Sequence, residues 1–472
     1  MIVPKKKITC NSANNDASFT TWLIPWAFQN DPGDPGREFV KHFFPTATAN
    51  PTAKAVKLCD LALEAWTKRQ GRKGGAPQAK VSIKRAEKDI SIGKCNVLFR
   101  LLMPDKTLWA ARVRNLLADE DVTLPLLESE VATMKYIKSR TRIPVPEVYA
   151  YDLDKNNVLG TPYILMECID GLPYPYPFTE RKVMTDKDIQ KVHDELLKIT
   201  TQLAGLGFDK IGMLQFDKTK PDGVVIGPII DFKYRVYGPF TTSREYYAAR
   251  MKLVHDDEGR KKMPADERVT PLLQTQAAPH AACAELLQGP FPLKHADMHW
   301  QNVLFNSRCE IVGVIDWERS QTVPHESATV IPFNLGEYAG RNWSDPTNHR
   351  LIQKYEDMAL KCFRMKAPQC PVTKTFGTPQ RKIGKCLDNY NWPMTHQTHA
   401  AELRKLIAAA ASPGAAEPKP RPLPSTTGRD VPIQGRPGPP RKMPLPRPWN
   451  IQEPREKQCM GREKGDRLVN RE

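Results

Sequence analysis

The chain has 472 residues, of which 40% are hydrophobic and 26% charged. These proportions exclude a membrane-embedded or fibrous protein and fit a globular one long enough for two or more packed domains. The 43 prolines predict that part of the chain lies outside any core. The net charge of +17 favours anionic partners in general. Because no module interleaves Lys and Arg with aromatics, we interpret it as a solvated surface and expect no nucleic-acid partner.

The ten cysteines are scattered without a C-x-x-C pair, which is typical of reduced thiols in an intracellular protein. The N-terminus carries a basic run, Lys5 to Lys7, but no apolar segment of the kind found in signal peptides follows it. No apolar stretch approaches the roughly 20 residues that cross a bilayer. We therefore expect a cytoplasmic protein with no membrane association.

Residues 1–85 form an N-terminal extension with one predicted helix, Ala53–Arg69, in which Val56, Cys59, Leu63 and Trp66 recur at helical spacing. Residues 86–168 change to strands and turns. A hairpin is predicted from Asn96–Leu102 and Thr107–Val113, which are separated by a short turn. The region ends in a small antiparallel sheet with one helix, whose other predicted members are Pro125–Ser139, Val148–Asp152 and Tyr163–Glu167.

Residues 169–411 are predicted to be mainly helical. The strongest helix starts near Asp186 and places six apolar residues on one face: Ile189, Val192, Leu196, Ile199, Leu203 and Leu206. Weaker helical patterns cover Leu351–Arg364 and Ala400–Ala411. Residues 412–472 are rich in proline and basic residues and are predicted to be a disordered tail. The tail could act as a linker, or a protein partner could dock on its polyproline segments.

The segment from His295 to Trp317 carries the most specific pattern in the chain. It reads His-x-Asp-x4-Asn, then a short apolar strand, a turn, and a second apolar strand that ends in Asp316. This order predicts that Asn302 and Asp316 lie at adjacent strand ends beside the loop carboxylate Asp297. Phosphoryl transfer needs a carboxylate that holds and deprotonates the attacking hydroxyl, and oxygen ligands that fix Mg²⁺ against the phosphates of a nucleotide.

Each of these residues also has a structural interpretation. Asp297 and Asn302 are common in turns and helix caps, and Asp316 could simply end a strand. His295 is expected to brace the loop by packing and hydrogen bonding. His295 and His299 have a spacing that could bind a metal ion, but no third ligand accompanies them.

Upstream residues supply the parts that a nucleotide site would need. The turn from Gly93 to Asn96, between two predicted strands, offers backbone amides that could cover phosphates. Arg112 could contact the phosphates, and Glu130 in the following helix could position that cation. From spacing alone, a surface salt bridge between the two, or no contact, is also compatible with the sequence.

Together these residues resemble the aminoglycoside phosphotransferase and choline kinase family, in particular its fungal-type members, over roughly Ile90 to Glu326. The resemblance implies an α+β, protein-kinase-like fold with a five-stranded antiparallel N-lobe and a helical C-lobe. It implies that Gly93 and Asn96 belong to the phosphate loop. It also implies that Glu167 and Cys168 belong to the hinge whose backbone receives adenine.

The same resemblance implies a kinase that uses ATP and Mg²⁺ to phosphorylate a hydroxyl of a small molecule. Asp297 would be the catalytic base, and Asn302 and Asp316 the metal ligands. Arg112 stands where the family has a phosphate-contacting Lys or Arg. The alternatives are a non-catalytic kinase-like protein that binds a nucleotide or a partner, and a protein kinase; the lone glycine of the phosphate loop and the absence of Ala-Pro-Glu count against the latter. The sequence leaves the identity of the acceptor open.

Overall fold

The computed structural model describes only part of the chain. All described residues lie in a compact unit formed by residues 1–428. They are residues 35–43, 50–71, 79–84, 90–93, 95–116, 124–173, 185–220, 223–255, 269–328, 357–358, 360–361, 363–365, 367–388 and 404–408. The tail predicted at residues 412–472 lies outside them.

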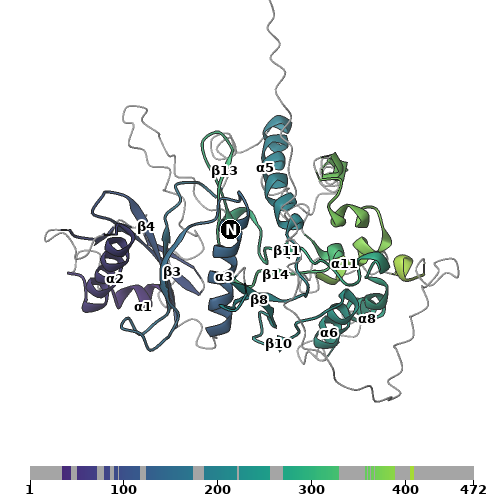
Figure 1. The fold of residues 1–472 in the computed structure, drawn as a ribbon, viewed down its shortest axis with the longest axis horizontal. Coiled ribbons are helices and arrows are strands. Elements are labelled where there is room, and N and C mark those ends of the chain that lie inside the picture. Colours follow the sequence, from purple (N-terminus) through teal and green to yellow (C-terminus); the bar gives the residue numbers. More distant parts are fainter. Residues whose placement is uncertain are drawn as a thin grey trace, which may run out of the picture. The chain divides into compact units, whose positions relative to one another are not determined.

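The N-terminal part is built around an antiparallel sheet in the order β1-β3-β4-β6-β5, with β2 paired to the edge of β3 (Figure 1). The predicted hairpin and the two later strands are confirmed. The resemblance implied five strands, but the described sheet has six. Its strands are β1 Ser82–Ile83, β2 Ile90–Ile92, β3 Asn96–Leu102, β4 Leu108–Arg114, β5 Val148–Asp152 and β6 Tyr163–Glu167.

Alternation along the strands divides the sheet between two cores, because successive side chains point to opposite faces. Trp109, Ala111 and Val113 of β4 pack into one cluster with residues of α1 (Pro35–Lys41) and α2 (Ala53–Arg69). Ala110 of β4 and Ile164 of β6 pack into the other cluster, with α3 (Leu124–Arg140). The helices predicted at 53–69 and 125–139 are thus confirmed, and they contribute to different cores.

Helix α2 is tied to the sheet by polar contacts as well as by burial. It begins after Thr52, whose side chain accepts a hydrogen bond from the backbone of Ala55 and thereby caps the first turn. At its other end the indole of Trp66 donates to Asp105 at 3.0 Å. Arg69 forms a two-pronged ion pair with Glu147, the residue just before β5, at 2.8 and 2.9 Å. The N-terminal extension therefore packs as part of the lobe.

The C-terminal part begins with α5 (Asp186–Gly205), the long helix predicted from Asp186. Thr185 and Asp188 form a reciprocal capping box at its start. The region also holds more strand than a mainly helical lobe was expected to have. Its other helices are α6 Ser243–His255, α8 Val269–Ala277 and α11 Pro379–Asp388, and its strands are β7 Met213–Phe216, β8 Val224–Gly227, β9 Ile229–Ile230, β10 Val236–Tyr237, β11 Leu293–Lys294, β12 Val303–Phe305, β13 Ile311–Val314 and β14 Gln321–Thr322.

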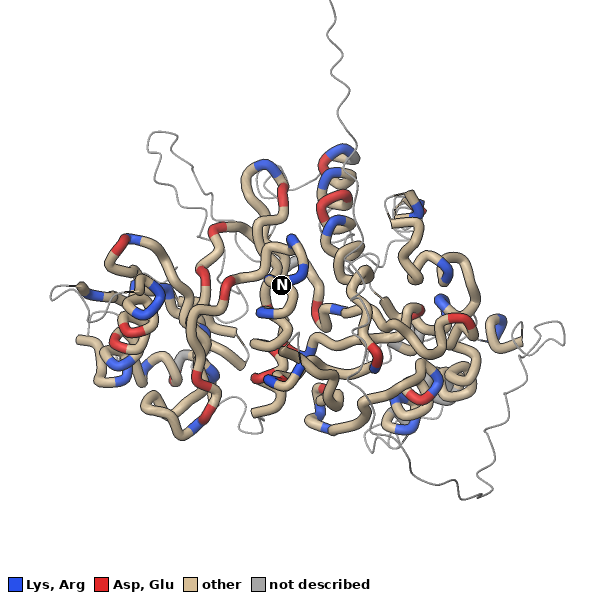
Figure 2. The backbone as a smooth tube through the Cα atoms, in the orientation of Figure 1, with Lys and Arg blue, Asp and Glu red and all other residues tan. Residues whose placement is uncertain are grey.

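The helices predicted at 351–364 and 400–411 are described only in short pieces, and those pieces, such as residues 363–365 and 404–408, are helical. Figure 2 shows that α2 and α5 each carry both basic and acidic residues along their length. No helix among the residues that the structure describes is both long and apolar enough to cross a membrane.

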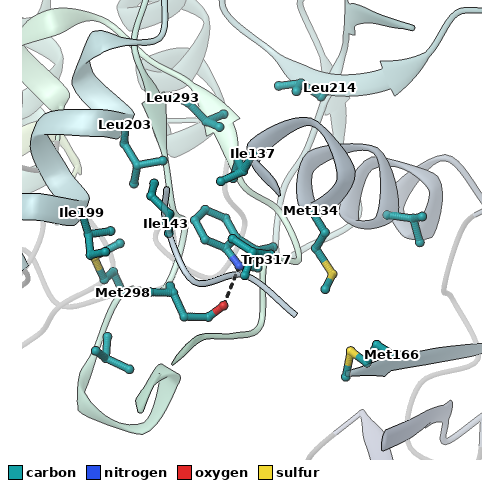
Figure 3. Packing of buried hydrophobic residues seen from close by; sticks show 14 of the residues in the cluster. Met134, Ile137, Ile143, Met166, Ile199, Leu203, Leu214, Leu293, Met298 and Trp317 are labelled. Atoms are coloured by element: carbon teal, nitrogen blue, oxygen red, sulfur yellow. Dashed lines mark hydrogen bonds between the residues drawn. The ribbon is translucent and has the colours of Figure 1, made fainter. Parts of the chain in front are cut away.

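Trp317 lies at the centre of the core that joins α3, α5 and the strands around residue 300 (Figure 3). Its side chain is completely buried, and its indole nitrogen donates to the carbonyl of Val314 at 2.8 Å. In the view of Figure 3, Ile137, Ile143 and Met298 lie around its side chain. The residue that follows Asp316 is thus fixed in the core, which holds Asp316 at the edge of that core.

Candidate active site

The hairpin of β12 and β13 brings the two predicted metal ligands together. Val303 pairs with Val314, so Asn302, just before β12, and Asp316, just after β13, lie at the same end of the hairpin. The backbone of Ile315 donates to the carbonyl of Asn302 at 3.0 Å. Antiparallel pairing alone therefore converts a separation of 14 residues in sequence into proximity in space.

His295 braces the loop that carries Asp297. Its Nδ1 accepts a hydrogen bond from the backbone of Asp297 at 3.1 Å, so Nε2 carries the proton and donates to the carbonyl of Ile315 at 3.0 Å. The ring packs edge-on against Trp317 at 4.6 Å between centroids. Burial lowers the pKa of His295, and the hydrogen bond to Ile315 opposes this only in part. A neutral imidazole therefore links the two loops, as expected from the sequence.

Asp297 is the most exposed acidic group of the loop, with 56% of its side chain accessible. Its backbone carbonyl accepts a hydrogen bond from the amide nitrogen of Asn302 at 2.8 Å. His299 Nε2 contacts its Oδ2 at 3.1 Å, and the Nδ1 of that ring accepts from the backbone of Gln301. Partial burial alone would raise the pKa of Asp297, but the hydrogen bond from His299 and the charge interactions with His299 and His295 together outweigh it and hold the pKa below its usual range.

The sequence alone did not reveal the contact that His299 makes with Asp297. Its spacing to His295 suggested only a weak metal motif, whereas the structure uses it to orient a carboxylate. Among the described residues, no three His, Cys, Asp or Glu side chains gather in a way that could hold a metal ion on their own. The order Asp-x-His could have indicated this contact, because the side chains of two loop residues separated by one residue can form a hydrogen bond with each other.

Arg112 reaches from β4 to the end of the β12–β13 hairpin, which we call the catalytic hairpin because Asn302 and Asp316, predicted from the sequence to serve phosphoryl transfer, flank it. Its Nη1 pairs with Glu130 of α3 in a very close contact. Its Nη2 contacts Asp316 Oδ1 at 2.9 Å and Glu318 Oε2 at 3.3 Å. In the amide orientation that satisfies both of its polar atoms, Asn96 accepts a further hydrogen bond from Nη2 at 2.8 Å. The structure therefore joins Asn96, Arg112, Glu130 and Asp316 in one cluster.

The electrostatics of this cluster follow from burial and charge balance. Glu130 is 2% exposed, and burial raises its pKa, with further raising by Glu318 and Asp316 and opposition from Arg112. Burial would also raise the pKa of Glu318, but Arg112 and Arg114 keep it below its usual range. Arg112 thus forms ion pairs with three carboxylates: Glu130 of the N-terminal part, and Asp316 and Glu318 of the C-terminal part.

Arg114 and Glu318 complete the cluster, and sequence reasoning assigned neither of them. Arg114 Nη1 lies 2.8 Å from Glu318 Oε2 and is almost fully buried. The signal for Arg114 was present in the strand: residues two apart on a strand share a face, so Arg112 and Arg114 both point toward the catalytic hairpin. Glu318 follows Asp316 by two residues, but no local pattern in the sequence indicates in which direction its side chain points.

The loop after β13 has an unusual backbone. Both Asp316 and Arg319 adopt left-handed conformations, each with φ of 62°, which non-glycine residues rarely do. Arg319 anchors the end of the loop through hydrogen bonds to the carbonyls of Ile230 and Asp231 at 3.0 and 2.5 Å. Local strain of this kind persists only where the surroundings enforce it.

The predicted phosphate turn and hinge occupy separate positions around the cluster. Gly93 donates its backbone N–H to the carbonyl of Asn96 at 2.8 Å, which closes the turn between β2 and β3. The carboxylate of Glu167 contacts Lys138 and the backbone of Glu147, at 3.2 and 3.1 Å, and its side chain is not part of the Arg112 cluster in the described contacts. Cys168 is half-buried at the end of β6.

The segment after the hinge runs directly onto the catalytic hairpin. Leu172 exchanges backbone hydrogen bonds with Phe305 of β12, at 2.8 and 2.7 Å. A side chain at Gly171 would place its Cβ 2.7 Å from Val312 and 2.9 Å from Leu304, so only glycine fits between the segment and the hairpin. The segment after the predicted hinge and the β12 strand are therefore joined by backbone hydrogen bonds.

Comparison with known proteins finds a family model that matches part of the chain. Residues 117–324 match the model of the phosphotransferase enzyme family. The matched region contains Glu130, Glu167, Asp297, Asn302 and Asp316, whereas Arg112 precedes it.

Two fungal proteins are similar in sequence to part of this chain. Altered inheritance of mitochondria protein 9 of Candida dubliniensis is 29% identical over 145 residues, which make up 30% of this chain and 23% of that protein. A subtelomeric hrmA-associated cluster protein of Aspergillus fumigatus is 28% identical over 131 residues, or 28% of this chain and 24% of that protein. The matched region thus spans about a quarter of the length of these relatives.

Among solved structures, a thermostable mutant of aminoglycoside phosphotransferase APH(4)-Ia in ternary complex with AMP-PNP and hygromycin B is 13% identical, covering 74% of this chain and 99% of that chain with a TM-score of 0.41. A putative fructosamine-3-kinase from Thermobifida fusca is 16% identical, covering 74% and 98% with a TM-score of 0.43. The resemblance seen in the sequence is confirmed over residues 117–324, which are similar to the phosphotransferase enzyme family.

Proposed function

We propose that the protein is a kinase that transfers the γ-phosphoryl group of ATP to a hydroxyl of a small molecule. Asp297 would hold and deprotonate the acceptor hydroxyl, and Asn302 and Asp316 would be ligands of Mg²⁺. The observation that carries the proposal is the meeting of three elements at one hairpin end: the Asp297 loop, the Asn302–Asp316 strand ends and Arg112 from the N-terminal sheet.

The state of Asp297 supports a role as general base. Its pKa is held below the usual range, so it is ionised at neutral pH. More than half of its side chain is accessible, so an acceptor hydroxyl can reach it. The hydrogen bond from His299 restricts the carboxylate to one orientation, which reduces the entropy lost when the substrate is aligned.

The donor set near the hairpin end fits a hard cation. Asn302 uses its amide nitrogen to bond the carbonyl of Asp297, which leaves the amide oxygen as its metal-binding atom. Asp316 is 43% exposed, and oxygen ligands of these two kinds are those that Mg²⁺ prefers. When bound, the ion would neutralise charge on the phosphates during transfer. Arg112, held by Glu130, would add a fixed positive charge beside them.

One observation favours the second candidate, a nucleotide-binding protein without catalytic activity. Arg112 already contacts Asp316, so one carboxylate oxygen of the proposed metal ligand is engaged by the protein itself. A site that stays closed in this way would bind a nucleotide without holding the metal ion in the position that transfer requires.

Nucleotide binding can be tested by thermal unfolding with and without saturating MgATP. A ligand that binds only the folded state stabilises by about 2.7 kcal/mol at a concentration near 100 times its Kd. We expect a clear rise in Tm for the native protein and for the control Asp154→Asn, an exposed loop carboxylate remote in sequence from the cluster. The rise should be strongly reduced in Asp316→Asn. An equal rise in Tm for Asp316→Asn and for the control Asp154→Asn would contradict the assignment of Asp316 as a metal ligand.

Transfer itself can be tested with radiolabelled ATP and a panel of hydroxylated metabolites, aminoglycosides, choline and amino sugars. The expected result is a labelled product with the native protein and a yield lower by roughly 10² or more with Asp297→Asn. Retained MgATP binding without transfer to any acceptor would favour the non-catalytic candidate.

A further inference from the structure

The Nη2 atom of Arg112 has more acceptors than hydrogens. It carries two hydrogens but faces Asn96 at 2.8 Å, Asp316 at 2.9 Å and Glu318 at 3.3 Å. One of these acceptors can therefore move away while every hydrogen of Nη2 keeps a partner. This matters because the Arg112 side chain is only 11% exposed, and an unpaired charge at such a depth is costly.

Among the two carboxylates, Asp316 is the one placed to leave. It is 43% exposed, whereas Glu318 is 14% exposed. Glu318 is also held by Arg114 Nη1 at 2.8 Å on the same oxygen that faces Arg112. The residues beside Glu318 are fixed as well, since Trp317 is buried in the core and Arg319 is bonded to the carbonyls of Ile230 and Asp231.

From this arrangement we infer that Glu318, held by Arg114, is a positioning residue that retains Arg112 when Asp316 turns from Arg112 to a divalent cation. The inference rests on the proposed function, because it takes Asp316 as a metal ligand. Without Glu318, the release of Asp316 would leave the guanidinium with Glu130 as its only carboxylate partner among the described contacts. Arg112 would then compete more strongly for Asp316, and metal binding would weaken.

The experiment compares the affinity for ADP in the presence of Mg²⁺ with the affinity for ADP in EDTA, measured by calorimetry. The ratio of the two affinities reports how readily Asp316 is released to the metal. We expect Glu318→Gln to lower this ratio about tenfold, a typical size for coupling between two bound groups. Arg114→Gln should lower it to a similar extent, and the double variant should lower it no further, because both substitutions remove the same ion pair.

The conservative variant Arg114→Lys keeps the charge and should recover part of the ratio. It also provides a measurement if Glu318→Gln fails to fold. Arg381→Gln is the matched control: Arg381 is a buried arginine of the C-terminal part that bonds backbone carbonyls, among them that of His325 at 3.3 Å. Its loss should lower Tm without changing the ratio.

Three results would overturn the inference. An unchanged ratio in Glu318→Gln would show that Arg112 needs no second carboxylate, while the native protein's own preference for Mg²⁺ would leave the proposed function intact. Additive losses in the double variant would indicate that Glu318 binds the metal itself. If the native protein binds ADP under neither condition, the proposed function fails and this inference fails with it.

Discussion

His299 holds Asp297 by a hydrogen bond of 3.1 Å between Nε2 and Oδ2. The ring is itself fixed by the backbone N–H of Gln301, which donates to Nδ1 at 3.1 Å. A carboxylate with more than half of its surface exposed is therefore restricted by a neighbour two residues away. This contact provides both orientation and a lowered pKa.

Removal of His299 should affect both properties. We expect His299→Ala to lower turnover roughly 10- to 100-fold, because a misplaced base loses the alignment on which transfer depends. The pKa of Asp297 should rise, since the hydrogen bond that lowers it is lost, so the acid limb of kcat/KM should move to higher pH. His299→Gln, which retains an amide N–H donor, should recover part of each effect. A pH profile that does not move in His299→Ala would contradict the role of this contact.

Asp297→Asn and Asp316→Asn should differ in which step they impair. Asp297→Asn is expected to leave MgATP affinity within a few-fold and to lower turnover by roughly 10² or more. Asp316→Asn should weaken MgATP binding as well as turnover. Asparagine is the appropriate replacement at Asp316, because it tolerates the left-handed backbone found there. Equal loss of nucleotide affinity in both variants, measured by titration, would refute the separation of roles.

In the Arg112–Glu130 pair, the loss of one partner should destabilise the fold more than the replacement of both partners by apolar residues. Arg112→Ala leaves Glu130 buried without its partner and should destabilise the fold by about 3–5 kcal/mol. The double variant Arg112→Met, Glu130→Leu should recover most of that loss, because two apolar side chains need no charge partner. Urea denaturation measures both effects. The double variant should still fail to bind MgATP, which separates the stabilising role of the pair from its role in the site.

Trp317 should be the largest single contributor to the stability of the catalytic hairpin. Trp317→Ala removes a completely buried ring and its hydrogen bond to Val314 and should cost about 3–5 kcal/mol. Trp317→Phe fills most of the space and should cost less. Val158→Ala, at a residue that is 63% exposed, is the control and should change the unfolding free energy little. A small effect of Trp317→Ala would show that the core repacks around the cavity.

Local patterns predicted the long elements and the hairpin end at which Asn302 and Asp316 lie. The helices at 53–69, 125–139 and from Asp186 have repeated apolar spacing, and the order of Asp297, Asn302 and Asp316 along two short strands specifies a hairpin end. The two-residue strand at Ser82–Ile83 has no such signal, because its existence depends on the partner strand β3.

The pairing of Arg114 with Glu318 could not be predicted for a related reason. The two residues are 204 positions apart, and each has several charged neighbours in sequence. Only the packing of the sheet against the catalytic hairpin decides which charges meet. By contrast, the partnership of Arg112 with Glu130 spans 18 residues within one strand–helix unit, so the order of elements was sufficient to suggest it.

Helices α1 and α2 pack on the sheet, so the unit that folds together begins upstream of residue 117, where the family match begins. Phe43 and Phe99 lie 4.8 Å apart between ring centroids, and Leu58 and Trp66 bury the same face of the sheet. A chain shortened to begin at residue 86 would keep Arg112 but expose that face to water. The unit that folds is therefore larger than the region matched to the family, and α1 and α2 contribute burial to it without supplying any residue of the Arg112 cluster.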